Sequence, residues 1–292
     1  MTSERCHVVV IEWPPGADRQ QRAEIIAAAT GKMPTICLGL ASKSLPCVLA
    51  TAQRDEARAA TKILRERGVL AVYPSTADIE SVGNPFMCKR LAPALGAPEP
   101  MYLCDPQMTR LDPRPLKMSD VTLLIKGRIQ RVDSKTDVSD NSSVSSYGYG
   151  GGVGPFGPFG GPLGPFYNDS LDTLSTGKVT TRNTSSYEVI DLYTATDPAV
   201  RIDARRFNYE LLGKRSLTDS ENMNRLAVLL AEQATSAFLD LDFNPASSFA
   251  HLSTRRTNVQ TGTSVDDRGP AFDFYSRLQC IIDRALRKAG RR

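Results

Sequence analysis

The sequence predicts an α+β protein with a small sheet-plus-helices domain at its N-terminus and a second α+β unit after it. Strand-like and helix-like segments alternate over residues 1–76, as expected for a small α+β domain. Residues 119–245 hold several strand-like runs followed by one helix, and a Pro-rich segment separates the two regions. The chain has 292 residues, of which 41% are hydrophobic and 23% charged, so it can bury two small cores.

The first strand and the first helix have recognisable boundaries. The β-rich run from Cys6 to Ile11 predicts a strand that is buried on both faces and ends before Pro14-Pro15-Gly16. Asp18, with Gln21 three residues later, forms a capping box that starts a helix. Gly31 is a natural end for this helix, because glycine readily adopts the left-handed cap conformation.

The rest of the N-terminal domain leaves one element open. Residues 33–44 fit a strand over Thr35–Leu38 or a short helix that begins at Pro34, where the missing N–H costs nothing. Further segments follow: a strand over 46–50, a helix over 54–67 and a closing strand over 69–73. The element order is therefore either ferredoxin-like βαββαβ or βααβαβ.

Several residues of this domain follow a loose motif of a known family. They are Ala29-Thr30-Gly31, Pro46, Val48-Leu49, Glu56-Ala57, Leu64 and Gly68, followed by a final strand. In this respect residues 1–75, about a quarter of the chain, resemble the C-terminal domain of the bacterial ribosomal stalk protein. The resemblance implies the βααβαβ order and a domain that recruits partner proteins through an exposed helical surface. It assigns no binding residue in this chain.

Residues 77–118 are rich in proline and are interpreted as a linker or an extended wrapping segment. Each proline removes a backbone donor and resists helix formation. Apolar residues such as Phe86, Leu91 and Tyr102 occur between the prolines. We therefore expect this segment to pack on the protein rather than to move freely.

The second α+β domain is predicted over residues 119–245. A long alternating run over 120–132 indicates a strand, and Gly127 in its middle indicates a bulge or a close packing contact. Further strands are expected at 187–193 and 200–202. The capping box Thr218-x-x-Glu221 then starts a helix.

A low-complexity insert over 134–178 interrupts this domain and is predicted to be a disordered hairpin loop. Its centre, 147–167, has no charged residue but nine glycines and four prolines. Such a composition cannot build a packed core, because the conformational entropy of glycine is large and the apolar groups are sparse. The segment also holds six aromatic residues, so it is either inert or adhesive. In the adhesive case Phe156, Phe159 and Phe166 are candidate protein-binding residues.

The C-terminal region is interpreted as a loop over 246–270 and a basic amphipathic helix over 271–292. The net charge of the chain is +4, and residues 255–292 hold nine basic and four acidic residues, so the positive charge is concentrated there. This helix either packs its apolar stripe on the second domain or binds an acidic partner. Arg284, Arg287 and Lys288 are the candidate binding residues on it.

No catalytic, cofactor-binding or metal-ligating residue is predicted. The two histidines, His7 in a strand and His251 in a loop, lack a second group of a catalytic pattern. The six cysteines contain no Cys-x-x-Cys pair. Thr30-Gly31-Lys32 resembles part of a phosphate loop, but Ile26 stands where the first glycine is required.

These observations favour a non-enzymatic protein-binding or scaffold protein that associates with a protein partner or with itself. The scattered cysteines and the absence of a signal-like or membrane-spanning apolar run favour a cytoplasmic location. Two alternatives remain: a nucleic-acid-binding protein driven by electrostatics, and an enzyme with an unrecognised site. No cofactor, membrane span or small-molecule ligand is expected.

Overall fold

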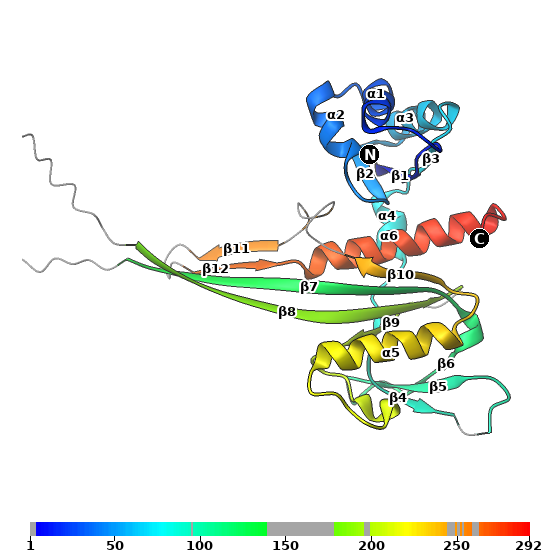
Figure 1. The fold of residues 1–292 in the computed structure, drawn as a ribbon, viewed down its shortest axis with the longest axis vertical. Coiled ribbons are helices and arrows are strands. Elements are labelled where there is room, and N and C mark those ends of the chain that lie inside the picture. Colours follow the sequence, from blue (N-terminus) through cyan, green and yellow to red (C-terminus); the bar gives the residue numbers. More distant parts are fainter. Residues whose placement is uncertain are drawn as a thin grey trace, which may run out of the picture.

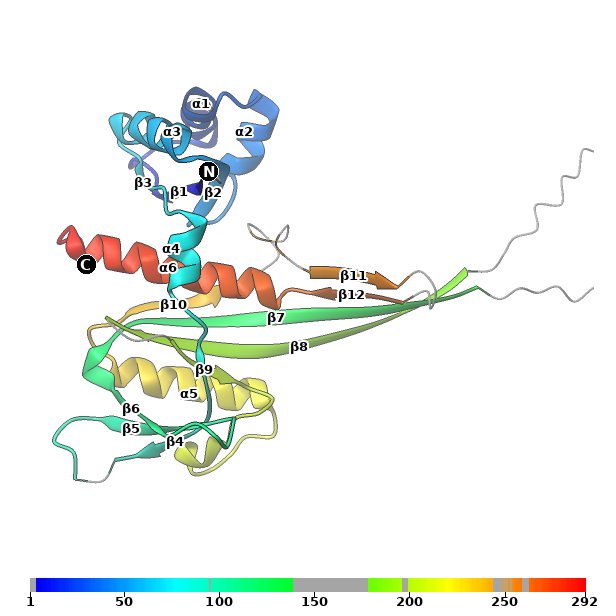
Figure 2. The ribbon, with the colours of Figure 1, turned by 180° about the vertical axis from the view of Figure 1, so that it is seen from behind.

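The computed structural model describes residues 4–94, 96–138, 178–195, 199–243, 249, 252, 254–258 and 263–292. The chain is an α+β protein whose strands form two separate sheets, one near each end of the body (Figures 1 and 2). The N-terminal sheet is small and has three strands, whereas the second sheet has nine. The C-terminal helix lies between the two sheets in both views.

The N-terminal unit has the order βααβαβ, because residues 34–41 form a helix and not a strand. Its three strands lie in the order β2-β1-β3, and both pairs are antiparallel. The elements are β1 (Arg5–Glu12), α1 (Arg19–Thr30), α2 (Pro34–Ala41), β2 (Cys47–Gln53), α3 (Arg54–Glu66) and β3 (Leu70–Val72).

Local sequence signals account for the helix boundaries of this unit. The Asp18 side chain accepts from the Gln21 backbone, and the Gln21 side chain accepts from the Asp18 backbone, so α1 starts at a complete capping box. Gly31 ends α1 with a φ of 66°, in the left-handed region. Pro34 occupies the first turn of α2. The helices cover one face of the sheet and enclose a core with Val8, Val10 and the other inward residues of β1.

The second sheet is large and mixed. Its path is β11-β12-β7-β8-β9-β4-β5-β6, and β10 pairs with the first half of β7. The strands are β4 (Phe86–Pro93), β5 (Met101–Pro106), β6 (Arg114–Lys117), β7 (Val121–Val138), β8 (Lys178–Thr194), β9 (Val200–Asp203), β10 (Phe238–Phe243), β11 (Thr254–Asn258) and β12 (Thr263–Asp267). The other elements are α4 (Thr76–Ser81), the 3₁₀ turns η1 (Met118–Asp120) and η2 (Tyr209–Leu212), α5 (Asp219–Gln233) and α6 (Gly269–Lys288).

Three segments differ from the sequence interpretation. Residues 77–118 are not a linker but hold most of α4 and the strands β4 to β6. Proline fits there because β6 is an edge strand, so the missing N–H of Pro115 breaks no ladder. The expected loop 246–270 contains β11 and β12, which pair with each other and extend the sheet. Residues 134–138 and 178 belong to strands; the rest of the predicted disordered insert, 139–177, lies outside the described residues.

Each face of the large sheet is covered by one helix. Helix α5 packs on one face, where Leu124 and Ile190 join its buried residues in one core. Helix α6 packs on the other face, against Leu123 and Ile125 of β7. Alternate residues of β7 therefore enter different cores, as the pleat of a strand requires.

Helix α6 also contacts the small sheet. The face of that sheet opposite α1–α3 presents Val9 and Leu70, with other apolar residues, to the core that contains α6. The C-terminal helix is therefore packed from both sides by residues that are distant from it in the sequence. Among the described helices, none is long and apolar enough to cross a membrane.

Candidate functional site

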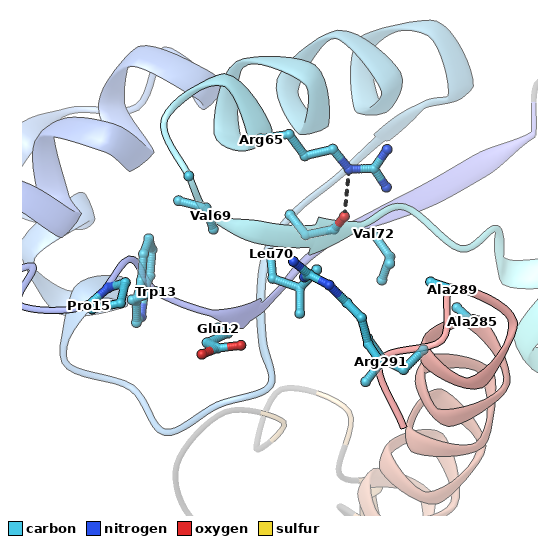
Figure 3. A pocket seen from close by; sticks show the side chains of 13 residues that line it. Glu12, Trp13, Pro15, Arg65, Val69, Leu70, Val72, Ala285, Ala289 and Arg291 are labelled. Atoms are coloured by element: carbon cyan, nitrogen blue, oxygen red, sulfur yellow. Dashed lines mark hydrogen bonds between the residues drawn. The ribbon is translucent and has the colours of Figure 1, made fainter.

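A groove of about 580 Å³ lies where the small sheet meets the end of α6 (Figure 3). Its walls come from the end of β1 and the turn that follows, the end of α3, the whole of β3, and the last turns of α6. Two sequence regions more than 200 residues apart therefore build this groove together.

The floor of the groove is apolar. Leu70 and Val72 alternate along β3 with Ala71, so both side chains point away from the helical layer and towards α6. On α6, Ala285 and Ala289 are four residues apart and lie on the same side of the helix. These small side chains leave space where larger ones would fill it.

The rim of the groove carries two arginines and one carboxylate. Arg65 on α3 donates from Nε to the carbonyl oxygen of Ala71 at 3.0 Å, which fixes its guanidinium beside the free edge of β3. Arg291 extends from the end of α6 towards Leu70. Glu12, at the end of β1, is the carboxylate. The lining has two positive charges against one negative charge, so it favours an anionic group.

Trp13 forms the end of the groove beside Pro15. Its side chain is 7% exposed, and the Arg22 guanidinium lies 5.9 Å from the ring centroid. Trp13 is the single tryptophan of the chain. The fluorescence of the protein therefore reports directly on this groove.

The lining residues suit binding better than chemistry. They include no histidine, cysteine, serine, threonine or tyrosine, and Glu12 is their one carboxylate. General acid–base and nucleophilic catalysis need a proton carrier or an activated nucleophile beside the substrate. The apolar floor and charged rim instead match the character of a recognition site.

No family model, no curated protein and no solved structure matches this chain.

The basic residues predicted on α6 lie outside the groove. Arg284 and Lys288 are exposed on the helix, and neither lines the groove. Arg287 makes structural contacts: Nε donates to Asp283 at 2.9 Å, and Nη2 donates to the carbonyl oxygens of Thr122 at 2.6 Å and Ser236 at 3.0 Å. Phe156, Phe159 and Phe166 lie outside the described residues.

A buried polar network holds α6 on the large sheet. Arg201 on β9 donates through two nitrogens to the Asp191 carboxylate, each at 2.7 Å, and also pairs with Asp273 on α6. Ser276 donates to Asp191 and hydrogen-bonds to Tyr193. Burial next to the Asp191 charge raises the pKa of Tyr193 well above its usual value. Asp191 and Ser276 are fully buried and do not line the groove, so this network anchors the helix.

The described histidine and the six cysteines are held within the fold. His7 hydrogen-bonds to Thr51 at 3.0 Å and Thr76 at 3.2 Å, and His251 lies outside the described residues. All six cysteines are buried and free, and burial raises the pKa of Cys47 and of Cys280 to about 11. In the described part of the chain, no three His, Cys, Asp or Glu side chains are grouped to hold a metal ion.

Local sequence patterns contain little sign of the groove residues. Trp13 is the single tryptophan and precedes Pro14-Pro15-Gly16, which is a weak signal for a surface turn. Arg65 and Arg291 are ordinary basic residues near helix ends. Only the packing of α6 against β3 brings these side chains together, and no local pattern encodes that packing.

Proposed function

We propose that this protein is a non-enzymatic protein-binding or scaffold protein whose groove receives an acidic, partly apolar segment of a partner protein. The observation that carries this proposal is the apolar floor of Leu70, Val72 and Ala289 between the guanidinium groups of Arg65 and Arg291. Carboxylates on the partner would pair with the arginines, while an apolar side chain covers the floor.

The dimensions of the groove support a segment rather than a whole domain surface. A volume of about 580 Å³ is in the range of sites that take a small ligand or a few side chains. We therefore expect micromolar affinity, as is common for short segments, and electrostatic steering that weakens with salt.

The N-terminal unit leaves its helical face free for another contact. Helices α1 to α3 lie on the face of the small sheet that points away from α6 (Figure 1). We propose that the resemblance to the ribosomal stalk domain extends to partner recruitment by this helical surface. In that case the groove and the helices would bind separate partners, as a scaffold does.

We further propose a cytoplasmic location. All six cysteines are free thiols in the interior of the described chain, which suits a reducing compartment.

A displayed library of random twelve-residue peptides, panned on the full chain, tests the proposed function. We expect enrichment of peptides in which Asp or Glu flank Leu, Ile or Phe. Arg291→Glu should weaken the enriched peptides at least tenfold, because it reverses the charge on the rim. Arg284→Glu is the matched control, since it makes the same charge change on α6 but outside the groove. Failure to enrich such peptides, or equal binding by both variants, would contradict the proposal.

A further inference from the structure

The strand β8 has a free edge over residues 180–186. In the described part of the chain, β9 pairs with β8 only at 189–192, and no strand pairs with 180–186 on this side. Figure 2 shows the long pair of β7 and β8 extending beyond the helices of the body. Every side chain of 180–186 is exposed, so neither face of this segment is covered by the described residues.

The backbone groups on this edge are arranged to form a further ladder. The carbonyl oxygen of Glu188 accepts from the Ala204 amide at 3.0 Å, so the backbone groups of Glu188 point towards β9. Because backbone groups alternate along a strand, the even-numbered residues from 180 to 186 point their N–H and C=O groups to the same edge. Each of them offers one donor and one acceptor to an added strand.

The edge lacks the features that usually prevent strand addition. Proteins protect edge strands with prolines, bulges or short length. Strand β8 has 17 residues and no proline, and its register with β7 runs without a shift from Tyr193 to Lys178. The edge strand β6, in contrast, has four residues and contains Pro115. The free edge of β8 is therefore suited to receive another strand.

One side of this edge carries unpaired positive charge. Even-numbered side chains of β8 lie on the same side of the sheet as α5, because Ile190 packs in the core that contains α5. Arg182 is the one charged residue of 180–186, and no described residue forms a hydrogen bond or an ion pair with its side chain. Arg128 on β7 donates to the Ser186 hydroxyl at 2.8 Å, and no described carboxylate pairs with it. A strand added here should therefore carry carboxylates on this side.

The opposite side of the edge is neutral. Thr181, Asn183 and Ser185 are uncharged, and the nearby charges on β7 are already paired, since Arg131 lies 3.2 Å from Asp133. Uncharged β-branched residues such as threonine suit this side of an added strand. The best occupant therefore alternates acidic and β-branched residues.

We propose that an extended acidic segment of a partner protein adds to residues 180–186 of β8 as an antiparallel strand. Antiparallel pairing lets each even-numbered residue exchange two hydrogen bonds with one residue of the partner. The added strand would continue the direction of β9, which is antiparallel to β8 on the same edge. Carboxylates beside Arg182 select acidic sequences. This inference uses none of the groove residues and is independent of the proposed function.

Amide hydrogen exchange of the full chain, followed by NMR, tests this inference with a capped peptide of alternating threonine and glutamate. At millimolar concentration this peptide should slow the exchange of Arg182, Thr184 and Ser186 at least threefold. The amides of Asn183 and Ser185 face β7 and should not change. A capped peptide of alternating threonine and lysine is the matched control and should protect none of them.

Three results would overturn the inference. The first is the absence of protection by the threonine–glutamate peptide, and the second is equal protection by both peptides. The third is slow exchange of Arg182, Thr184 and Ser186 before any peptide is added, because the edge would then already be occupied.

Charge variants place the peptide on this edge. Arg182→Glu should remove the protection by the threonine–glutamate peptide and allow the threonine–lysine peptide to protect the edge. Arg256→Glu is the matched control, since Arg256 is exposed on β11, which β12 and β7 separate from β8. Arg291→Glu should also leave the protection unchanged, which distinguishes this edge from the groove. Wild-type protection in Arg182→Glu would refute the role of Arg182.

A proline on the edge tests the backbone contribution. Thr184→Pro removes an outward N–H group and places a ring on the free edge, but takes no hydrogen bond from the ladder with β7. It should therefore abolish binding of the threonine–glutamate peptide. Continued protection of Asn183 and Ser185 would show that β8 is still paired with β7. Undiminished peptide binding by Thr184→Pro with that ladder intact would refute strand addition at this edge.

Discussion

Gly127 shows how a single residue fixes the position of α6. It lies within β7, and a Cβ placed on it would stand 2.4 Å from Cε2 of Phe272 and 3.0 Å from Cδ1 of Phe243. These distances are far inside van der Waals contact. The absence of a side chain at Gly127 therefore lets the helix approach the sheet closely, as the position of glycine in the strand predicts.

Replacing Gly127 by alanine should destabilise the protein. We expect Gly127→Ala to lower the free energy of unfolding by about 1–3 kcal/mol, because Phe272 is fully buried and has no room to move. Urea denaturation followed by circular dichroism measures the change. Gly39→Ala is the control: nothing lies within 4 Å of its Cβ in α2, so it should stabilise by about 0.5–1 kcal/mol. If Gly127→Ala left the free energy of unfolding unchanged, α6 would not pack closely on β7.

Asp191 provides a second test at the residue scale. Its side chain has no exposure, and it bonds to Arg201 and Ser276. Asp191→Ala leaves the Arg201 guanidinium with one carboxylate instead of two, so we expect a loss of about 3–5 kcal/mol of stability. The partly exposed pair of Arg90 and Asp105 serves as the control, and Asp105→Ala should cost about 1 kcal/mol or less. Similar losses in the two variants would show that the buried network does not anchor α6.

Most of helix α6 serves to hold the fold together, because its apolar face is buried. Its buried residues include Phe272, Leu278 and Ile282, and it packs against both sheets. Deletion of 271–292 would therefore remove much of one core, and a loss of binding in such a deletion would not identify a binding surface. Point variants at Arg284 and Arg291 separate binding from folding.

The long pair β7–β8 extends beyond the helices that cover the body, accompanied by β11 and β12 (Figure 2). Over residues 180–186 every side chain of β8 is exposed. In the described part of the chain, β9 pairs with β8 only at 189–192, so the outer edge of 180–186 has no partner strand. The carbonyl oxygen of Glu188 accepts from the Ala204 amide, so the backbone groups of Glu188 point to the edge of β8 that faces β9. Because backbone groups alternate along a strand, the N–H and C=O groups of the other even-numbered residues of β8 point to this edge as well.

This direction predicts a pattern of amide exchange. Even-numbered residues of β8 point their N–H groups outwards, so Arg182, Thr184 and Ser186 should exchange quickly. The odd-numbered Asn183 and Ser185 face β7 across the ladder and should be protected. Hydrogen exchange followed by NMR resolves the individual amides. Equal protection along 182–186 would show that another strand occupies this edge.

At the scale of the whole molecule, the packing of α6 between two sheets creates the groove. The groove uses Ala285 and Ala289. Arg287 lies within about one turn of them but bonds to the Thr122 carbonyl on the large sheet. Binding at the groove would therefore stabilise the joint between the two units.

Much of the fold was readable from the sequence, because local signals such as the Asp18 and Thr218 caps and the alternating run of β7 reflect local structure. The sequence does not decide the secondary structure of residues 33–44, because a short apolar run fits a strand as well as a helix. The prolines of 77–118 predict a linker or an extended wrapping segment, but proline is equally tolerated in an edge strand such as β6. The groove could not be predicted, because only long-range packing brings Arg65 and Arg291 to its rim.

The fluorescence of Trp13 provides the most direct test of the groove. An acidic peptide selected from the library should produce a saturable change in Trp13 emission with one peptide per chain, and the affinity should fall as salt rises. Arg291→Glu should weaken this change at least tenfold, and Arg284→Glu should leave it intact. Tight binding of the peptide without any change in Trp13 emission, or with the same affinity in both variants, would place the partner elsewhere and contradict the account.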